Sequence, residues 1–509
     1  MRAKIRVFLG LLLPVFAIGC KGVDAAYTAE TARGAHAYIQ IDYTPKADME
    51  NVRLNIKGIR GIKAEAGLVG AVGISGKGKF PDPIFTDGPF TFKADTTYNL
   101  WIDAYVPADE HSGVYKGYLK VSSSTLRDKI PVSITVWPVM MAEPQFASVN
   151  WAFDRPDLLK LWNNGNEVDR YSEDYWLYVR QIAKALKGMH QGTIQIPTLD
   201  LIDQDGDGFD FSNFDKWVEV FREEGALKQL QGDEFGRRAR PEWECPDFAL
   251  YVPTDTAKLL LPIEDSLTVD FYGRFLPTYI QHLKDLGVYD NFVQRLCDEP
   301  LDANAEGYRK VAEFVKGIAP DLKIIEALQT TKLEGVVDVQ VPQLDKWHEN
   351  FDYFDKCRQN GETVWFYTCC QPRGKYPNRF IEQSLTKARS LFWLANKYGA
   401  DGYLHWGFNY WNDKPYEQTD VPGAGIDLPG GDSWIVYPGN RNLVKSRRYC
   451  AVRDGIEDYT LLQMLAERNP ERAAEICNMV AKDWLDCGED EAAMASARHL
   501  LLQELSKKE

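Results

Sequence analysis

Two adjacent carboxylates, Asp298 and Glu299, follow an apolar run in the segment Leu296-Cys297-Asp298-Glu299-Pro300. Neighbouring like charges raise each other's pKa, so such a pair can keep one carboxyl group protonated near neutral pH. A protonated carboxyl is the group that general acid catalysis requires. Alternatively, the pair belongs to a loop that caps the next helix. We expect Pro300 to keep Glu299 extended, so that both side chains reach one site.

The segments around this pair predict an alternation of strands and helices. We expect strands at 148–151, 193–196, 226–230, 292–296, 323–328, 337–341, 363–367 and 402–406. We expect helices at about 171–188, 213–224, 267–286, 303–318, 345–358 and 381–398. Eight strands with intervening helices indicate a (β/α)8 TIM-like barrel, here residues 143–460, whose active site lies at the carboxyl ends of the strands.

The seventh predicted strand lacks the second acid that many barrel glycosidases use as a nucleophile. Residues 363–370 contain no Asp or Glu, and Glu362 precedes the strand at its other end. Tyr367 is expected at the mouth position instead. The eighth strand is followed by aromatic and amide residues, of which Trp406, Asn409 and Trp411 are candidates for lining a sugar site.

The flanking regions predict a secreted protein with two further parts. Residues 1–20 resemble a lipoprotein signal peptide in which Cys20 becomes the lipidated N-terminus, and 21–31 would be a tether. This predicts a lipoprotein of a bacterial cell envelope, periplasmic or at the cell surface, that meets the membrane only through its lipid. Period-two patterns at 32–142 predict a β-sandwich without chemistry of its own. Residues 461–509 are expected to be helical.

Composition excludes some partners. The formal net charge is −15, and such a surface repels nucleic acid. The histidines and cysteines show no metal-ligand spacing, so we expect no metal and no cofactor. A second carboxylate pair, Asp233-Glu234, could lie at the site rim or in the framework. A metal shared with His190 is the alternative.

Several motifs together resemble glycoside hydrolase family 123 and its wider relatives. They are Asp298-Glu299, the segment 402–406, Gly431-Asp432, Tyr437-Pro438-Gly439 and the segment 453–459. The resemblance implies a β-N-acetylgalactosaminidase that works by substrate-assisted catalysis, in which the 2-acetamido oxygen of the substrate is the nucleophile.

This resemblance also implies residue roles. Glu299 would be the general acid and then the base, and Asp298 would orient the acetamido N–H. From their strand-end positions, Tyr367 would bond the acetamido carbonyl, Trp406 would form the floor, and Asn409 and Trp411 would contact the sugar. The 453–459 motif would hold the last barrel helix in place.

The sequence thus predicts a retaining exo-β-N-acetylhexosaminidase acting on glycans with a terminal N-acetylhexosamine. One alternative is a glycosidase with two protein carboxylates, Glu299 with Asp233 or Glu234. The other is a non-catalytic, glycan-binding surface lipoprotein.

Overall fold

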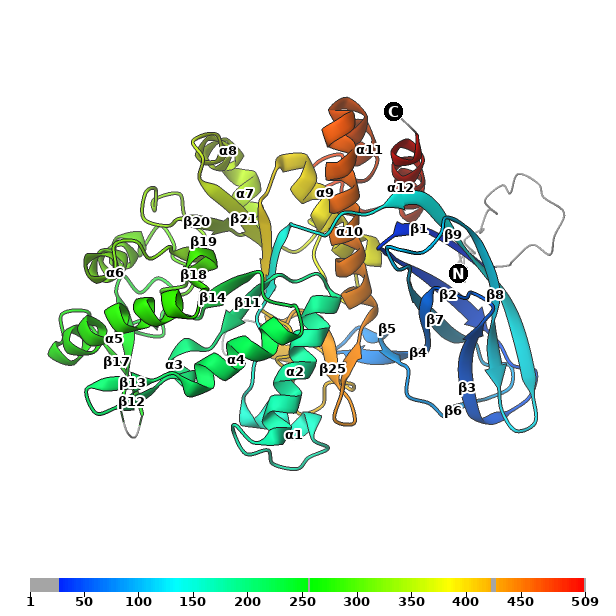
Figure 1. The fold of residues 1–509 in the computed structure, drawn as a ribbon, viewed down its shortest axis with the longest axis horizontal. Helices are drawn as coiled ribbons and strands as arrows, with labels where there is room; N and C mark the ends of the chain where they lie inside the picture. Colours follow the sequence, from blue (N-terminus) through cyan, green and yellow to red (C-terminus); the bar gives the residue numbers. More distant parts are fainter. Residues whose placement is uncertain (1–26, 255–256, 423–426, 508–509) are drawn as a thin grey trace, which may run out of the picture.

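The computed structural model describes residues 27–254, 257–422 and 427–507. Figure 1 shows two parts: strands β1–β9 lie on one side, and a region of parallel strands and helices lies on the other. The long helix α10 (Arg447–Arg468) runs between them. The predicted signal peptide, Cys20 and the first part of the tether lie outside the described residues.

The first part consists of two β-sheets that pack face to face. One sheet has the order β1 (Tyr27–Arg33), β9 (Arg127–Met140), β8 (Gly113–Ser122), β3 (Met49–Lys57) and β6 (Phe90–Phe92). The other has the order β2 (His36–Tyr43), β7 (Tyr98–Tyr105), β4 (Lys63–Ile74) and β5 (Gly78–Phe85). Buried side chains of both sheets form one apolar core, as the alternation in the sequence predicts. However, β1 starts at Tyr27, so the end of the expected tether is a strand that pairs with β9.

The second part contains eight parallel strands at the predicted places. Five form a sheet in the order β10 (Ala147–Asn150), β22 (Gly402–His405), β21 (Thr363–Tyr367), β20 (Val339–Pro342) and β19 (Ile325–Leu328). Three form a second sheet in the order β11 (Thr193–Ile196), β14 (Gln229–Gly232) and β18 (Phe292–Gln294). A parallel bridge from Gln294 to Ile324 links the sheets. Neighbours in sequence are thus neighbours in space, which is the strand order of an α/β barrel.

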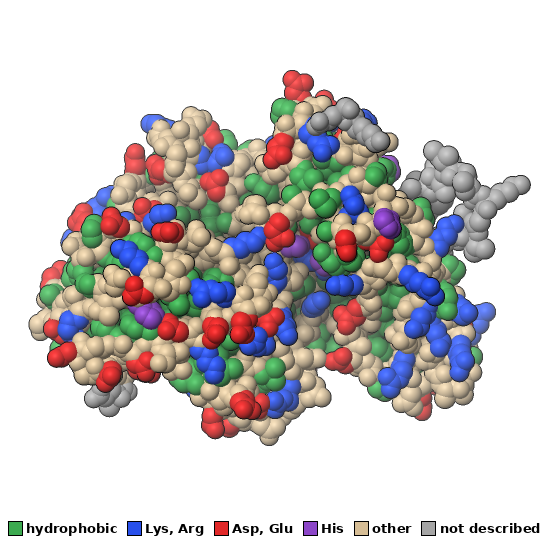
Figure 2. Space-filling model, in the orientation of Figure 1, with side chains coloured by type: hydrophobic (Ala, Val, Ile, Leu, Met, Phe, Trp, Pro, Cys, Tyr) green, Lys and Arg blue, Asp and Glu red, His purple; other side chains and the backbone are tan. Residues whose placement is uncertain are grey.

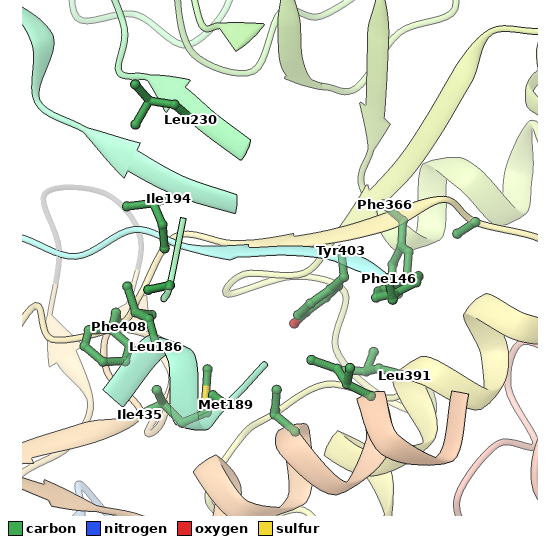
Figure 3. Close-up of a cluster of buried hydrophobic side chains, with 14 of the residues drawn as sticks. Phe146, Leu186, Met189, Ile194, Leu230, Phe366, Leu391, Tyr403, Phe408 and Ile435 are labelled. Atoms are coloured by element: carbon green, nitrogen blue, oxygen red, sulfur yellow. The ribbon is translucent and has the colours of Figure 1, made fainter. Parts of the chain in front are cut away.

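Helices follow most of these strands; the six predicted helices lie close to their expected positions, that at 345–358 as two helices, whereas α1 and α3 were not predicted. They are α1 (Pro156–Trp162), α2 (Glu173–Gly188), α3 (Thr198–Leu201), α4 (Ser212–Glu223), α5 (Ser266–Asp285), α6 (Ala305–Ile318), α7 (Leu344–Glu349), α8 (Phe351–Gln359) and α9 (Leu385–Tyr398). Residues 329–338, all described, connect β19 to β20 without a helix. Figure 3 shows Ile194, Phe366 and Tyr403 from the strands facing Leu186 and Leu391 from the helices. Burial of these apolar faces holds the strand and helix layers together.

The C-terminal helices join the two parts. Helix α10 continues past residue 460, the expected boundary, and is followed by α11 (Pro470–Val480) and α12 (Glu491–Ser506). Arg453 of α10 donates to both carboxylate oxygens of Asp103 in β7, at 2.9 and 2.8 Å. Asp458 accepts from Arg389 of α9 at 2.6 and 2.9 Å and from Arg498 of α12. The 453–459 motif therefore fixes not only the last helix of the parallel-strand region but also the sandwich.

In the view of Figure 2, Lys and Arg side chains predominate over the sandwich, whereas acidic and basic side chains are mixed over the other part. In the described part of the chain, no helix has the length and apolarity that a membrane crossing needs.

Candidate active site

Glu326 of β19 holds the segment that leads into Asp298 and Glu299. This carboxylate is fully buried, and its Oε2 accepts from the backbone N–H groups of Leu296 and Cys297, at 3.2 and 3.0 Å. The hydroxyl of Tyr308 donates to the same oxygen at 2.9 Å. Burial raises the pKa of Glu326 to about 8. The end of the β18 segment is therefore fixed immediately before the two acids.

Arg238 holds the two acidic residues themselves through their backbone carbonyls. It ends β15 (Gly236–Arg238), which forms a small antiparallel sheet with β16 (Phe248–Pro253) and β17 (Lys258–Leu261) between β14 and α5. Its Nη1 donates to the carbonyl of Asp298 at 2.8 Å, and its Nη2 donates to the carbonyl of Glu299 at 2.7 Å. The guanidinium also lies 3.8 Å from the ring centre of Trp243, whose carbonyl accepts from Nε at 2.7 Å. All three nitrogens of the guanidinium thus donate to backbone carbonyls, and two of these bonds hold the short turn that carries the acids.

The backbone at Glu299 differs from the expectation. Glu299 has φ +42°, in the left-handed region, and not the extended conformation that Pro300 was expected to impose. A non-glycine residue in this region is strained, and such strain persists only where the surroundings fix it. The two bonds from Arg238 to the carbonyls on either side of the turn supply that constraint.

The side chain of Glu299 points toward the ends of β19 and β21. Its Oε1 accepts from the hydroxyl of Tyr367 and from Nε2 of Gln329, the latter at 3.3 Å. Gln329 Nε2 also lies 3.3 Å from the Tyr367 hydroxyl. Each of the three side chains therefore contacts the other two, and we call them the Glu299–Tyr367–Gln329 triangle. Burial, and then the charge of Asp298, raise the pKa of Glu299 to about 7. Glu299 is thus suited to hold a proton at neutral pH and to release it.

Asp298 occupies the more open side of the turn. Its side chain is 40% exposed, and its Oδ1 lies 3.2 Å from Nη2 of Arg295. The same nitrogen lies 3.5 Å from Glu234, and the guanidinium lies 3.8 Å from the ring centre of Trp151. Burial raises the pKa of Glu234 to about 7. Arg295 therefore counters the negative charge of Asp298 while leaving the carboxylate accessible to a ligand.

Trp406 follows β22 at the same end of the strands and is partly exposed. Its Nε1 donates to both oxygens of Asp432, at 3.2 Å each, and its ring lies edge-on to Phe153 and Tyr410. Asp432 is fully buried, and burial raises its pKa to about 7. Asp432 therefore fixes the orientation of an indole that could face a ligand.

Asn409 and Trp411 have other roles than the expected sugar contact. Asn409 is fully buried, and its amide group accepts from the N–H of Phe153 and donates to the carbonyl of the same residue, both at 2.8 Å. Trp411 is also buried, and its Nε1 donates to the carbonyl of Val436 at 2.7 Å. Since their polar groups are satisfied within the protein, both side chains stabilise the loop after β22.

The second carboxylate pair divides between two environments. Asp233 accepts from the backbone N–H of Thr198 at 2.9 Å, and burial raises its pKa to about 8. It is thus a framework residue, whereas Glu234 faces Arg295. His190 contacts Glu457, not the Asp233-Glu234 pair, so the alternative of a metal shared among these three is wrong.

The arrangement places an acid with a raised pKa, Glu299, next to a charged and accessible carboxylate, Asp298. It places a tyrosine hydroxyl at the end of β21, where many glycosidases carry a nucleophilic acid. Sequence reasoning missed Arg238 and Gln329. Gln329 directly follows β19, so it could have been found from the rule that active-site residues of a barrel lie at the carboxyl ends of its strands.

Comparison with known proteins identifies the family of the chain. The model of the glycoside hydrolase 123 catalytic domain matches residues 161–465, more than half of the chain. A family 123 glycoside hydrolase from Clostridium perfringens, described in work on glycolipid glycan hydrolysis, has a TM-score of 0.71 at 16% identity, with 94% of this chain and 92% of that chain covered. That match establishes similarity of fold.

More distant solved structures also match. A family 2 β-galacturonidase from Eisenbergiella tayi has a TM-score of 0.36 at 10% identity, covering 83% of this chain and 69% of that one. An endo-β-1,4-mannanase from Thermotoga petrophila has a TM-score of 0.34 at 11% identity, covering 63% of this chain and 77% of that one. None of the curated protein sequences compared matches the chain. On the family match, the chain belongs to glycoside hydrolase family 123.

Proposed function

We propose that this glycoside hydrolase is a retaining exo-β-N-acetylhexosaminidase, with β-N-acetylgalactosaminides as its substrates, and that it works through an oxazoline. The observation that carries the proposal is the Glu299–Tyr367–Gln329 triangle, in which each side chain contacts the other two. It places a tyrosine where a two-carboxylate enzyme would need its nucleophile. A substrate that brings its own nucleophile fits this arrangement.

The proposed reaction has two steps. In the first, the acetamido oxygen attacks the anomeric carbon while Glu299 protonates the departing glycosidic oxygen. Asp298 accepts a hydrogen bond from the acetamido N–H and stabilises the positive charge that develops there. In the second step, Glu299 removes a proton from water, which attacks the anomeric carbon and opens the oxazoline with net retention.

Other residues complete the proposed site. Tyr367 donates to Glu299 in the free protein, and we propose that it turns to the acetamido carbonyl when substrate binds. Trp406 would form the floor of the sugar site. We further propose that the strands form a complete (β/α)8 barrel, that Cys20 carries a lipid, and that the enzyme is a cell-envelope lipoprotein acting on glycans with a terminal N-acetylhexosamine.

A substrate panel tests the proposed reaction. For an aryl β-galactoside, which lacks the acetamido group, we expect kcat/KM to fall at least about 10⁴-fold below that of the aryl β-N-acetylgalactosaminide, because the nucleophile is lost. A thiazoline analogue of the oxazoline should inhibit competitively. The two-carboxylate alternative would use Glu234, which shares Arg295 with Asp298. Similar rates on both substrates, with a glycosyl group trapped on Glu234, would establish that alternative.

Arg238 is expected to act as a positioning residue. In Arg238→Lys, a point charge replaces the fork that bonds two carbonyls and stacks on Trp243. We expect kcat on substrates with poor leaving groups to fall about 10- to 100-fold, with KM changed less than about threefold, because the acid is misplaced. Arg237→Lys on the same strand is the matched control, since Arg237 is exposed. Equal kcat values for the two variants would show that the fork is dispensable.

A further inference from the structure

A second cluster of chemically active side chains lies away from the candidate active site, where the sandwich meets the rest of the molecule. It consists of His36 in β2, His190 between α2 and β11, and Glu457 in α10. Within the described ranges, it is the one place where three such donor atoms lie within 4.8 Å of one another. The proposed hydrolytic reaction uses none of them.

The three groups converge on a single carboxylate. His36 Nδ1 lies 2.6 Å from Glu457 Oε1, and His190 Nε2 lies 3.0 Å from the same oxygen. Glu457 is fully buried, whereas the imidazoles keep 17% and 15% of their side-chain surface exposed. Two imidazole nitrogens and a carboxylate oxygen, with one side open to water, match the donor set of many three-ligand zinc sites.

The distances allow a metal after a small adjustment. Tetrahedral zinc with bonds of about 2.0–2.1 Å separates its ligand atoms by about 3.3 Å. The distance from Glu457 Oε1, now 2.6 Å for His36 Nδ1 and 3.0 Å for His190 Nε2, therefore needs to grow by about 0.7 Å and about 0.3 Å. The rings of His36 and His190 are already nearly perpendicular, with an interplanar angle of 71° and centres 6.1 Å apart. This arrangement lets both nitrogens face a common point without a clash between the rings.

Two further features orient the ligands. His190 has φ +58°, in the left-handed region that a glycine would occupy with less strain, yet the chain places an imidazole there. The other oxygen of Glu457, Oε2, accepts from the backbone N–H of His36 at 2.9 Å. Hydrogen bonds of this kind, made by atoms that do not bind the metal, commonly set the orientation of metal ligands.

We propose that His36, His190 and Glu457 bind a zinc ion, with water as the fourth ligand, and that this ion ties the sandwich to the parallel-strand region. Each ligand comes from a different segment, and Glu457 is 421 residues from His36 and 267 from His190 along the chain. Zinc would replace the two histidine–glutamate hydrogen bonds at this junction with three metal–ligand bonds, next to the pair between Arg453 and Asp103. The proposed reaction at Asp298 and Glu299 does not use this site. Zinc binding should therefore change the stability of the protein more than its turnover.

Zinc titration of the purified full chain, without a histidine tag and after treatment with a chelator, tests the proposal. We expect a saturable calorimetric isotherm with one zinc per chain, confirmed by metal analysis after dialysis. At a free zinc concentration about 100 times Kd, Tm should rise by about 3 °C. Cobalt in place of zinc should give the visible absorption of a four-coordinate site with nitrogen and oxygen donors.

His36→Gln and His190→Gln should each weaken zinc binding more than about 100-fold, because each removes a ligand. His499→Gln is the matched control. His499 contacts both carboxylate oxygens of Glu30 at 3.1 Å in a similar histidine–glutamate pair, but without a second histidine. If either ligand variant fails to fold, the cobalt spectrum of the unmodified chain decides. Absence of stoichiometric binding, or equal affinity in the control and ligand variants, would show that the cluster is only a hydrogen-bonded contact.

Discussion

Glu299→Gln is expected to lower kcat on an aryl N-acetylgalactosaminide with a poor leaving group by about 10³- to 10⁴-fold, because the amide cannot donate a proton to the leaving oxygen. The substitution keeps the shape of the side chain and its capacity to accept bonds from Tyr367 and Gln329. Substrate binding should therefore change little. With a very good leaving group, which departs without protonation, the first step should be nearly normal.

Added azide provides the sharpest readout for this variant. A small anion needs no general base to open the oxazoline, so azide should restore turnover and yield the β-glycosyl azide. Glu242→Gln is a suitable control, since Glu242 is exposed in the loop that also contains Trp243. Wild-type hydrolysis by Glu299→Gln, or loss of activity without azide rescue, would contradict the assignment of Glu299 as acid and base.

The pKa of Glu299 adds a pH signature to the same experiment. Burial and the charge of Asp298 raise this pKa to about 7. The acid form is present below the pKa and is lost as the pH rises through it. For substrates with poor leaving groups, kcat should therefore fall about tenfold per pH unit above about pH 7. This alkaline limb should be absent in Glu299→Gln.

Much of the framework was predictable because it follows from periodicity. All eight parallel strands were expected from short apolar runs, although β14 starts three residues later than predicted and β19 and β20 each start two residues later. The Asp298-Glu299 pair was predictable because it directly follows a buried run. The absence of an acid in the β21 segment was visible in the sequence as well. Each of these features depends only on residues that are close together in the sequence, so the sequence alone reveals it.

The contacts that position the site were not predictable, because they link distant segments through backbone atoms. Arg238 acts on the carbonyls of Asp298 and Glu299, 60 and 61 residues away, and carbonyls leave no trace in side-chain patterns. The left-handed φ of Glu299 results from that tertiary contact and overrides the preference set by Pro300. Asn409 was misplaced for a related reason, since its partner, the backbone of Phe153, is 256 residues away.

Asp298→Asn is expected to lower kcat by about 10²- to 10³-fold on substrates that carry the acetamido group. The asparagine fits the same space beside Arg295, but it has no charge to stabilise the cation that forms as the acetamido oxygen attacks. Its amide can also present N–H where the acetamido N–H needs an acceptor. The loss should fall on the first step, so a better leaving group should not restore the rate as it does for Glu299→Gln.

Glu234→Gln is the matched control for Asp298→Asn, because both carboxylates contact the same nitrogen of Arg295, at 3.5 and 3.2 Å. If the substrate supplies the nucleophile, Glu234→Gln should lower kcat by less than about tenfold, since it removes only a neighbouring charge. If a protein carboxylate attacks, the order of the two effects should reverse. Comparing kcat of the two variants on one acetamido substrate therefore distinguishes the two mechanisms. A larger loss in Asp298→Asn indicates that the acetamido group is the nucleophile, and a larger loss in Glu234→Gln indicates that Glu234 is.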